Sequence, residues 1–113
     1  MSDHKSHQAY VSSCRAKAAE IAAAVLDGSI PMLEGCHLLD ELVAGVDVPS
    51  EDPDFRIFNL IQSETDSLPI GQVRDHWSLD ALARIEPDIQ TAIAWAKPIA
   101  FPALQSVVVR FGA

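Results

Sequence analysis

The chain has 113 residues, which is enough to bury one hydrophobic core without disulfides or a structural metal and too few to suggest a second domain. Apolar residues make up 49% of it, a share that excludes a disordered chain despite a formal net charge of −8. The excess of 16 acidic over 8 basic side chains argues against a nucleic-acid partner, because phosphate binding requires clusters of Lys and Arg. We therefore expect one folded acidic domain spanning residues 1–113.

The first ten residues, MSDHKSHQAY, are polar and lack the apolar run of a secretory signal. We expect residues 1–6 to form a flexible tail. The two cysteines, Cys14 and Cys36, have no C-x-x-C spacing, so a reduced, cytoplasmic protein is the simplest interpretation.

A first amphipathic helix is predicted over residues 7–27, because its apolar residues recur at helical spacing on one face. Gly28 is placed to end this helix, since the residue after a helix often needs a positive φ. A second helix is predicted over residues 31–45, with Cys36 on its buried face. In a hairpin folded at Gly28, Cys14 and Cys36 lie at different heights and should not pair.

Residues 46–53 are predicted to form a linker, in which Asp52 and Pro53 suit the N-cap and first position of a third helix. The sequence DFRIFNLIQSE that follows also suits a strand, because it is rich in aromatic and β-branched residues. A polar stripe at helical spacing favours the helix. The stripe consists of Arg56, Asn59 and Ser63. Ser78 is suited to cap the next helix.

The C-terminal third is expected to be interrupted at Glu86–Pro87 and then to form a long apolar helix over residues 88–111. Pro98 and Pro102 should bend that helix, and they also disfavour a membrane span in the same segment. A strand stays open for residues 106–111. The predicted fold class is an all-α bundle of four to five helices with a long, proline-kinked C-terminal helix.

The segment SETDSLPIGQVRDHW (63–77) carries several ionisable side chains beside loop-forming Pro and Gly residues. On the third helix Glu64 falls on the apolar side, so its carboxylate would need donors that Arg74 can supply as a bidentate pair. Asp66 can hold loop N–H groups, and His76 follows close behind. We expect these four residues to form a structural latch, with a catalytic or ligand site as the alternative.

The spacing Glu34-x-x-His37 matches half of a carboxylate-bridged di-metal pattern, but no second copy occurs in the sequence. Helical periodicity points both side chains, together with Glu41, away from the core. Neither Cys14 nor Cys36 has a local signature of an activated nucleophile. We therefore expect no metal, no cofactor and no catalytic residue.

From Asp27 through Phe55 the chain has eight acidic residues and no Lys or Arg. Such a run is commonly just a solvated face. Its functional interpretation is a surface that attracts a basic protein partner. The residues predicted for that surface are Asp40, Glu41, Asp47, Glu51 and Asp52.

A series of short motifs resembles a family of small, uncharacterised bacterial proteins over about residues 20–95. The motifs are LDG (26–28), EG (34–35), DPDF (52–55), SETDSLPIG (63–71), HW (76–77) and AL (81–82). SETDSLPIG followed by HW is the specific part of the resemblance. It implies an α-helical cytoplasmic protein and no assigned activity, while Pro98 and Pro102 depart from the uninterrupted last helix that it would lead us to expect.

These observations favour a non-enzymatic protein-interaction module, such as an immunity or antitoxin-like protein that binds a basic partner. The alternative is a small-molecule or metal-dependent enzyme that uses the polar segment 64–76. Neither a nucleic acid nor a membrane is an expected partner, and a homodimer stays open.

Overall fold

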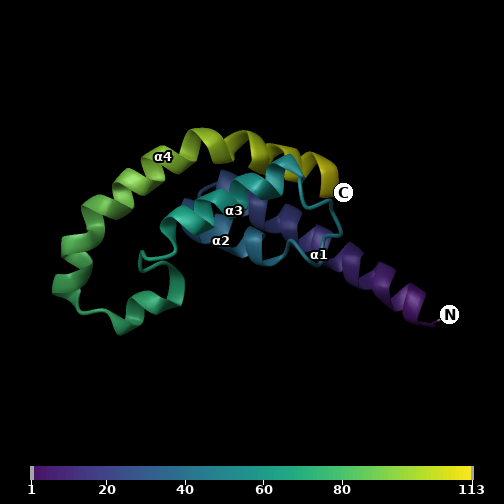
Figure 1. Cartoon of the computed structure of the whole chain (residues 1–113), viewed down its shortest axis with the longest axis horizontal. Helices are drawn as coiled ribbons and strands as arrows, with labels where there is room; N and C mark the ends of the chain where they lie inside the picture. The colour runs from purple at the N-terminus through teal and green to yellow at the C-terminus, as the bar shows by residue number, and fades with distance from the viewer. Residues whose placement is uncertain (1, 113) are drawn as a thin grey trace.

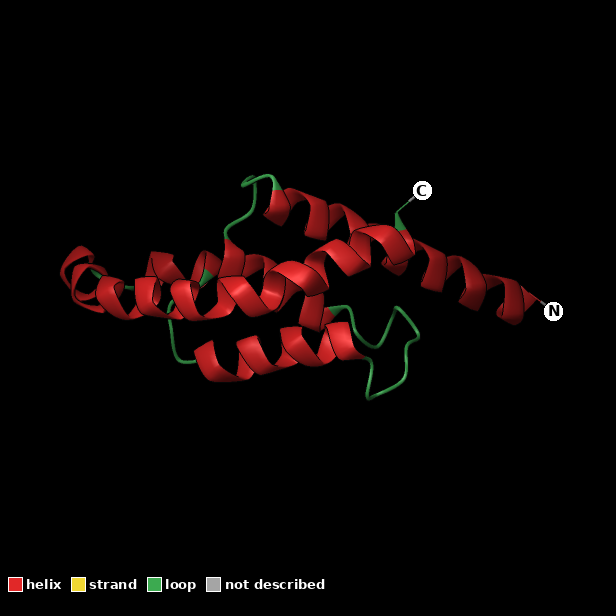
Figure 2. Cartoon of the chain, turned by 90° about the horizontal axis from the view of Figure 1, so that it is seen from above, coloured by secondary structure: helices red, strands yellow, loops and turns green. Residues whose placement is uncertain are grey.

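Five helical segments account for most of the chain. The computed structural model describes the backbone of residues 2–112 and the side chains of residues 6–112. The segments are α1 (Ser2–Leu26), α2 (Met32–Glu41), α3 (Pro53–Thr65), the 3₁₀ helix η1 (Gly71–His76) and α4 (Leu79–Phe111). No strand occurs within residues 2–112, as Figure 2 shows. The predicted all-α fold with a long C-terminal helix is confirmed.

Several boundaries differ from the sequence-based predictions. The first helix begins at Ser2, so residues 2–6 are helical where the sequence predicts a flexible tail. The second ends at Glu41, four residues before the predicted end near 45, and turns follow it. The last helix continues through Pro87, where a break is predicted, and residues 106–111 belong to it rather than to a strand.

The helices are arranged with α4 arching over the other three (Figure 1). The second half of α4 lies along α1 and α3, whereas its first half and η1 extend away at one end of the molecule (Figure 1). The first turns of α1 project at the opposite end, where residues 6–10 are exposed. The molecule is accordingly elongated, with extents of 55 × 28 × 25 Å. The core lies between these two ends, where all four α-helices meet.

The α1–α2 hairpin is a close contact between helices. Gly28 ends α1 with a φ of +88°, as predicted, and the Ser29 N–H donates to Asp27 Oδ1 at 2.8 Å. A Cβ atom at Gly35 would lie 2.1 Å from Cγ2 of Val25, so only glycine allows the two helices to approach this closely. Cys14 and Cys36 are both buried and unpaired. Burial raises the pKa of the Cys36 thiol to about 12.

The start of α3 follows the predicted capping pattern. Asp52 is the N-cap and accepts a hydrogen bond from the Phe55 N–H at 3.2 Å, and Pro53 occupies the first position of the helix. The buried face of α3 repeats at helical spacing and is formed by Phe55, Phe58, Ile61 and Thr65. Helical periodicity therefore prevails over the strand propensity of this segment.

The prolines of α4 explain why a helix of 33 residues can curve around the core. Pro87, Pro98 and Pro102 are all exposed, on the outer side of the helix. A proline has no N–H and its ring crowds the preceding turn, so the helix opens on the proline side and bends away from it. The bend presses the small inner residues of α4 onto the core. These inner residues include Ala96, Ala100, Ala103 and Leu104. Ser78 caps the helix by accepting from the Ala81 N–H at 3.1 Å, as predicted.

Among the described residues α4 is also the one helix that is long and apolar enough to cross a membrane. The core helix of a soluble protein can pass the same test of length and composition. In this fold α4 packs against α1, α2 and α3, but only 28% of its most apolar 18-residue window is buried, so most of that window is partly or fully exposed.

Candidate functional site

Asp52 does not belong to an exposed acidic surface, contrary to the prediction. Its side chain is only 6% exposed, because it caps α3 and faces the end of α4. Arg110 donates to it in a bidentate pair, from Nη2 to Oδ1 at 2.8 Å and from Nη1 to Oδ2 at 3.1 Å. Burial raises the pKa of Asp52, but the hydrogen bonds from Arg110 and Phe55 outweigh burial and leave the pKa below its usual value.

The same arginine joins a second carboxylate of α3 to α4. Arg110 Nη1 donates to Asp54 Oδ2 at 2.8 Å, and the Ser106 hydroxyl donates to that oxygen at 2.6 Å. The contacts of Arg110 with Asp52 and with Asp54 are the ion pairs found within the described part of the chain. Arg110 also lies over the Phe111 ring, 4.8 Å from its centroid. Nothing local in the sequence links Asp52 to Arg110, which is 58 positions away, so this pairing was not predicted.

The other four residues of the predicted surface lie near one another in the chain and differ in exposure. Glu41, Asp47 and Glu51 are exposed, whereas Asp40 is half-buried. Asp40 Oδ1 accepts from Asn59 Nδ2 of α3 at 3.2 Å. All four carboxylates therefore belong to the end of α2 and the turn that follows it.

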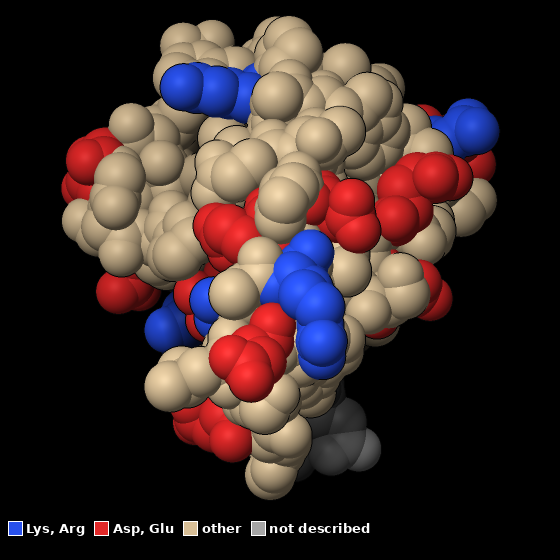
Figure 3. All heavy atoms as spheres, turned by 90° about the vertical axis from the view of Figure 1, so that its left-hand side faces the viewer, with Lys and Arg blue, Asp and Glu red and all other residues tan. Residues whose placement is uncertain are grey.

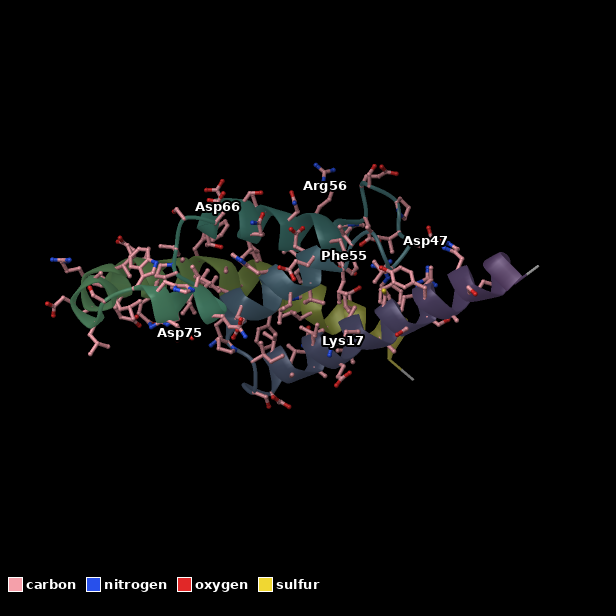
Figure 4. The ribbon with its side chains drawn as sticks, turned by 90° about the horizontal axis from the view of Figure 1, so that it is seen from below. Lys17, Asp47, Phe55, Arg56, Asp66 and Asp75 are labelled. Carbon is pink, nitrogen blue, oxygen red and sulfur yellow. The ribbon has the colours of Figure 1, made fainter. Side chains whose placement is uncertain are left out.

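That turn is held against α1. Asp47 has a φ of +54°, a conformation that aspartate tolerates better than most residues. Arg15 of α1 donates to the backbone oxygens of Val46 and Asp47, at 2.8 and 3.2 Å. Figure 4 shows Asp47 at this turn beside α1, and Arg56 of α3 pointing away from the fold. The turn is therefore an anchored part of the surface.

A groove of about 650 Å³ lies between the end of α2 and the length of α3 from Phe55 to Ser63, and we call it the α2–α3 groove. Its apolar floor includes Leu60 and Val43, which are 43% and 38% exposed and so leave large apolar side chains in contact with water. Its polar lining holds one carboxylate and one guanidinium, and consists of Asp40, Ser50, Arg56, Asn59 and Ser63. This arrangement can take an apolar side chain of a partner while nearby carboxylates face basic groups around it.

The structure does not form the predicted Glu64–Arg74 pair. Glu64 is exposed, because successive residues turn by about 100° around the helix and this places Glu64 beyond the edge of the face that Phe58 and Thr65 bury. Arg74 is half-buried, and its Nη1 donates to the Pro69 carbonyl at 3.4 Å. The four residues of the predicted latch therefore do not act together.

The remaining two residues of the predicted latch, Asp66 and His76, also lie exposed at the surface. Asp66 caps the end of α3, and Figure 4 shows it on the opposite side of the view from Asp75 of η1. Glu64 lines a hollow of about 440 Å³ beside α4, and His76 does not line that hollow. The four residues of the predicted latch thus do not converge on one site.

A hydrogen bond between His37 and Thr65, and not the predicted latch, holds the start of segment 64–76. The Thr65 hydroxyl donates to the Ile61 carbonyl at 2.6 Å, so its oxygen accepts from His37 Nε2 at 2.7 Å. His37 therefore faces α3, whereas the sequence predicts a solvated side chain. Burial lowers the pKa of His37 more than the nearby carboxylates of Asp40, Glu41 and Asp66 raise it. The segment is further held by Pro69, which is fully buried.

Within residues 6–112 no three His, Cys, Asp or Glu side chains are placed so that they could hold a metal ion. Glu34 and His37 in particular contact different elements: Glu34 lies beside η1, and His37 lies against α3. No family model, curated protein or solved structure matches this chain. The α2–α3 groove and the acidic residues near it in the chain are therefore the candidate functional surface.

Proposed function

We propose that this protein is a non-enzymatic interaction module that binds a basic protein partner at the α2–α3 groove. The observation that carries the proposal is the position of the groove: the exposed apolar side chains of Val43 and Leu60 lie beside Asp40. One wall comes from the stretch 27–55, which has no Lys or Arg, and Arg56 is the one basic residue on the α3 wall. An immunity or antitoxin-like protein, which occupies a basic partner, is the class of protein that this arrangement fits best.

The two parts of the surface have different physical roles. The carboxylates of Glu41, Asp47 and Glu51 are exposed, so they attract a basic partner over distance and contribute little once the contact is closed. The apolar floor of the groove acts at short range, because covering Leu60 and Val43 removes apolar surface from water. The proposal therefore assigns the association rate to the acids and the lifetime of the complex to the groove.

Site-specific photo-crosslinking tests the location of the contact. Leu60 is replaced by p-benzoylphenylalanine, and Ala23, exposed on α1, is replaced in a matched control. We expect one basic protein from the native organism to be crosslinked from position 60 and not from position 23. Equal crosslinking from both positions, or none from position 60, would contradict the proposal.

The recovered partner then allows a test of the charges. A variant with Asp40, Glu41 and Asp47 changed to amides should fold normally and associate more slowly, with a shallower dependence on salt. The control changes Asp80, Glu86 and Asp88 of α4 to amides, which removes the same formal charge from the other end of the molecule. Equal association rates for the two variants would reduce the acidic stretch to a solubility feature.

A further inference from the structure

A second hollow lies between α2, the segment that leads into η1, and the first half of α4. Its volume is about 430 Å³, within the range of small-molecule sites. Leu33, Ile70, Ile89 and Ile93 provide its apolar lining. It shares no lining residue with the α2–α3 groove, so what it binds is independent of the proposed function.

Three charged side chains line this hollow without pairing. Arg74, Glu34 and Asp75 all contribute to it, yet none of them forms an ion pair within the described residues. The guanidinium of Arg74 has five N–H donors, and its protein hydrogen bond is the long one to the Pro69 carbonyl at 3.4 Å. Both Arg74 and Glu34 are half-buried, and their polar atoms that lack a protein partner remain in contact with water at the mouth of the hollow.

Gly71 brings the chain close to Glu34. Its φ is +73°, and a Cβ atom there would lie 3.3 Å from Glu34 Oε1. Glycine therefore permits both the turn and the approach of the backbone to this carboxylate. The negative group thus lies at the wall of the hollow rather than free in solvent.

The charges select among ligand classes. A simple anion would meet two carboxylates, and a simple cation would leave the guanidinium without a partner. A neutral apolar molecule would cover all three charges without satisfying them. Figure 3 shows the end of the molecule that carries η1 and the start of α4, where basic and acidic side chains lie next to one another. A ligand with both charges and an apolar body meets every requirement.

We propose that this hollow binds a zwitterion of the class of free apolar α-amino acids. The ligand's ammonium group faces Glu34 and Asp75, its carboxylate faces Arg74, and its side chain lies on the apolar floor. Charge-assisted hydrogen bonds to both ends fix its orientation. The floor distinguishes it from small amino acids, because an apolar side chain gains free energy by leaving water.

Amide chemical-shift titration with four probes tests the ligand class. The probes are L-leucine, N-acetyl-L-leucine, which lacks the ammonium, L-leucinamide, which lacks the carboxylate, and glycine, which lacks the side chain. We expect L-leucine to shift amides at Glu34, Gly71 and Asp75, and each other probe to bind at least about tenfold more weakly. No shift at these amides with L-leucine, or equal binding of L-leucinamide, would overturn the proposal.

Variants of the charged groups test the orientation. In Arg74→Met the preference for L-leucine over L-leucinamide should disappear, whereas the exposed Arg84→Met control should keep it. In the double variant Glu34→Gln, Asp75→Asn the preference over N-acetyl-L-leucine should disappear instead. If the two variants lose the same preference, or if Arg84→Met behaves as Arg74→Met does, the proposed orientation is wrong. Because each result is a ratio of affinities in one variant, a general loss of stability does not imitate it.

Discussion

Asp52 and Arg110 are the residues whose pairing should matter most for stability. Asp52→Asn keeps a side chain that can cap α3 but removes the charge that Arg110 faces. We expect the free energy of unfolding to fall by about 2 to 3 kcal/mol, the range for losing a charge-assisted hydrogen-bonded pair at a buried group. Urea denaturation measures this loss. The neighbouring Glu51→Gln, at an exposed residue, should change it by less than about 0.5 kcal/mol.

The pH dependence of this pair has a definite sign. The pKa of Asp52 is lower in the folded protein than its ordinary value of 3.8, so the pair stabilises the fold fully above that pH. The stabilisation is lost as pH falls through the lowered folded-state pKa. An unchanged urea midpoint in Asp52→Asn at neutral pH would contradict the role of the pair.

His37 should make stability depend on pH in a higher range. Its folded-state pKa lies below the ordinary value of 6.5, so the unfolded chain takes up a proton first as pH falls. Stability should therefore be complete above pH 6.5 and decrease below it, until the folded-state pKa is reached. The measurement is the urea midpoint between pH 7.5 and pH 5 for the native protein and His37→Gln, in which the decrease should be smaller. The exposed His76→Gln serves as control and should keep the native dependence.

The contact between α1 and α2 makes Gly35 the most sensitive glycine of the helices. In Gly35→Ala the new methyl group would meet Val25 Cγ2 at 2.1 Å, so the helices must separate. We expect a loss of about 1 to 3 kcal/mol, as for an overpacked core. Removing the obstructing methyl groups supplies the test: the double variant with Val25→Ala should be more stable than the sum of the two single changes predicts. Simple additivity would show that the two residues do not collide.

The elements themselves were largely predictable from local patterns. Asp52–Pro53, Gly28 and Ser78 mark helix ends because capping depends on neighbouring residues alone, and the structure has all three in the predicted roles. Pro87 was misleading, since an exposed proline can bend a long helix without ending it when both halves pack elsewhere. For α3 the helix was predicted correctly, but the side of it that is buried was not. A helical wheel places Glu64 beside Leu60, but only the neighbouring helices determine which side is covered.

The candidate site was less predictable than the elements. The acidic stretch could be read from composition, yet the groove beside it requires the packing of α2 on α3. Asp52 shows the limit most clearly, because the arginine that removes it from the surface comes from the far end of the chain. Arg74, in contrast, was expected to have a partner and instead lines a hollow with carboxylates that it does not reach.

At the scale of the whole molecule, the elongated shape predicts that one end opens before the other. No residue from 70 to 88 is buried, whereas α4 contributes buried residues from Ile89 onward. We expect amide hydrogens of 71–86 to exchange through local opening, with rates that depend little on added urea. Amides of α3 and of residues 96–107 should exchange only through global unfolding. The measurement is amide hydrogen exchange by NMR at increasing urea concentrations. If the exchange rates of both regions rose equally steeply with urea, a separate opening of residues 71–86 would be contradicted.

The contact between α1 and α4 has a kinetic consequence. Helical proteins usually fold fast because most of their contacts join residues close in sequence. Here α1 packs mainly against α4, although 52 residues separate Leu26 from Leu79. The chain must therefore close a long loop before α1 gains its main partner. Until then the face of α1 that packs on α4 remains uncovered, so the folding rate should depend on contacts between α1 and α4 more than on the helical propensity of either element.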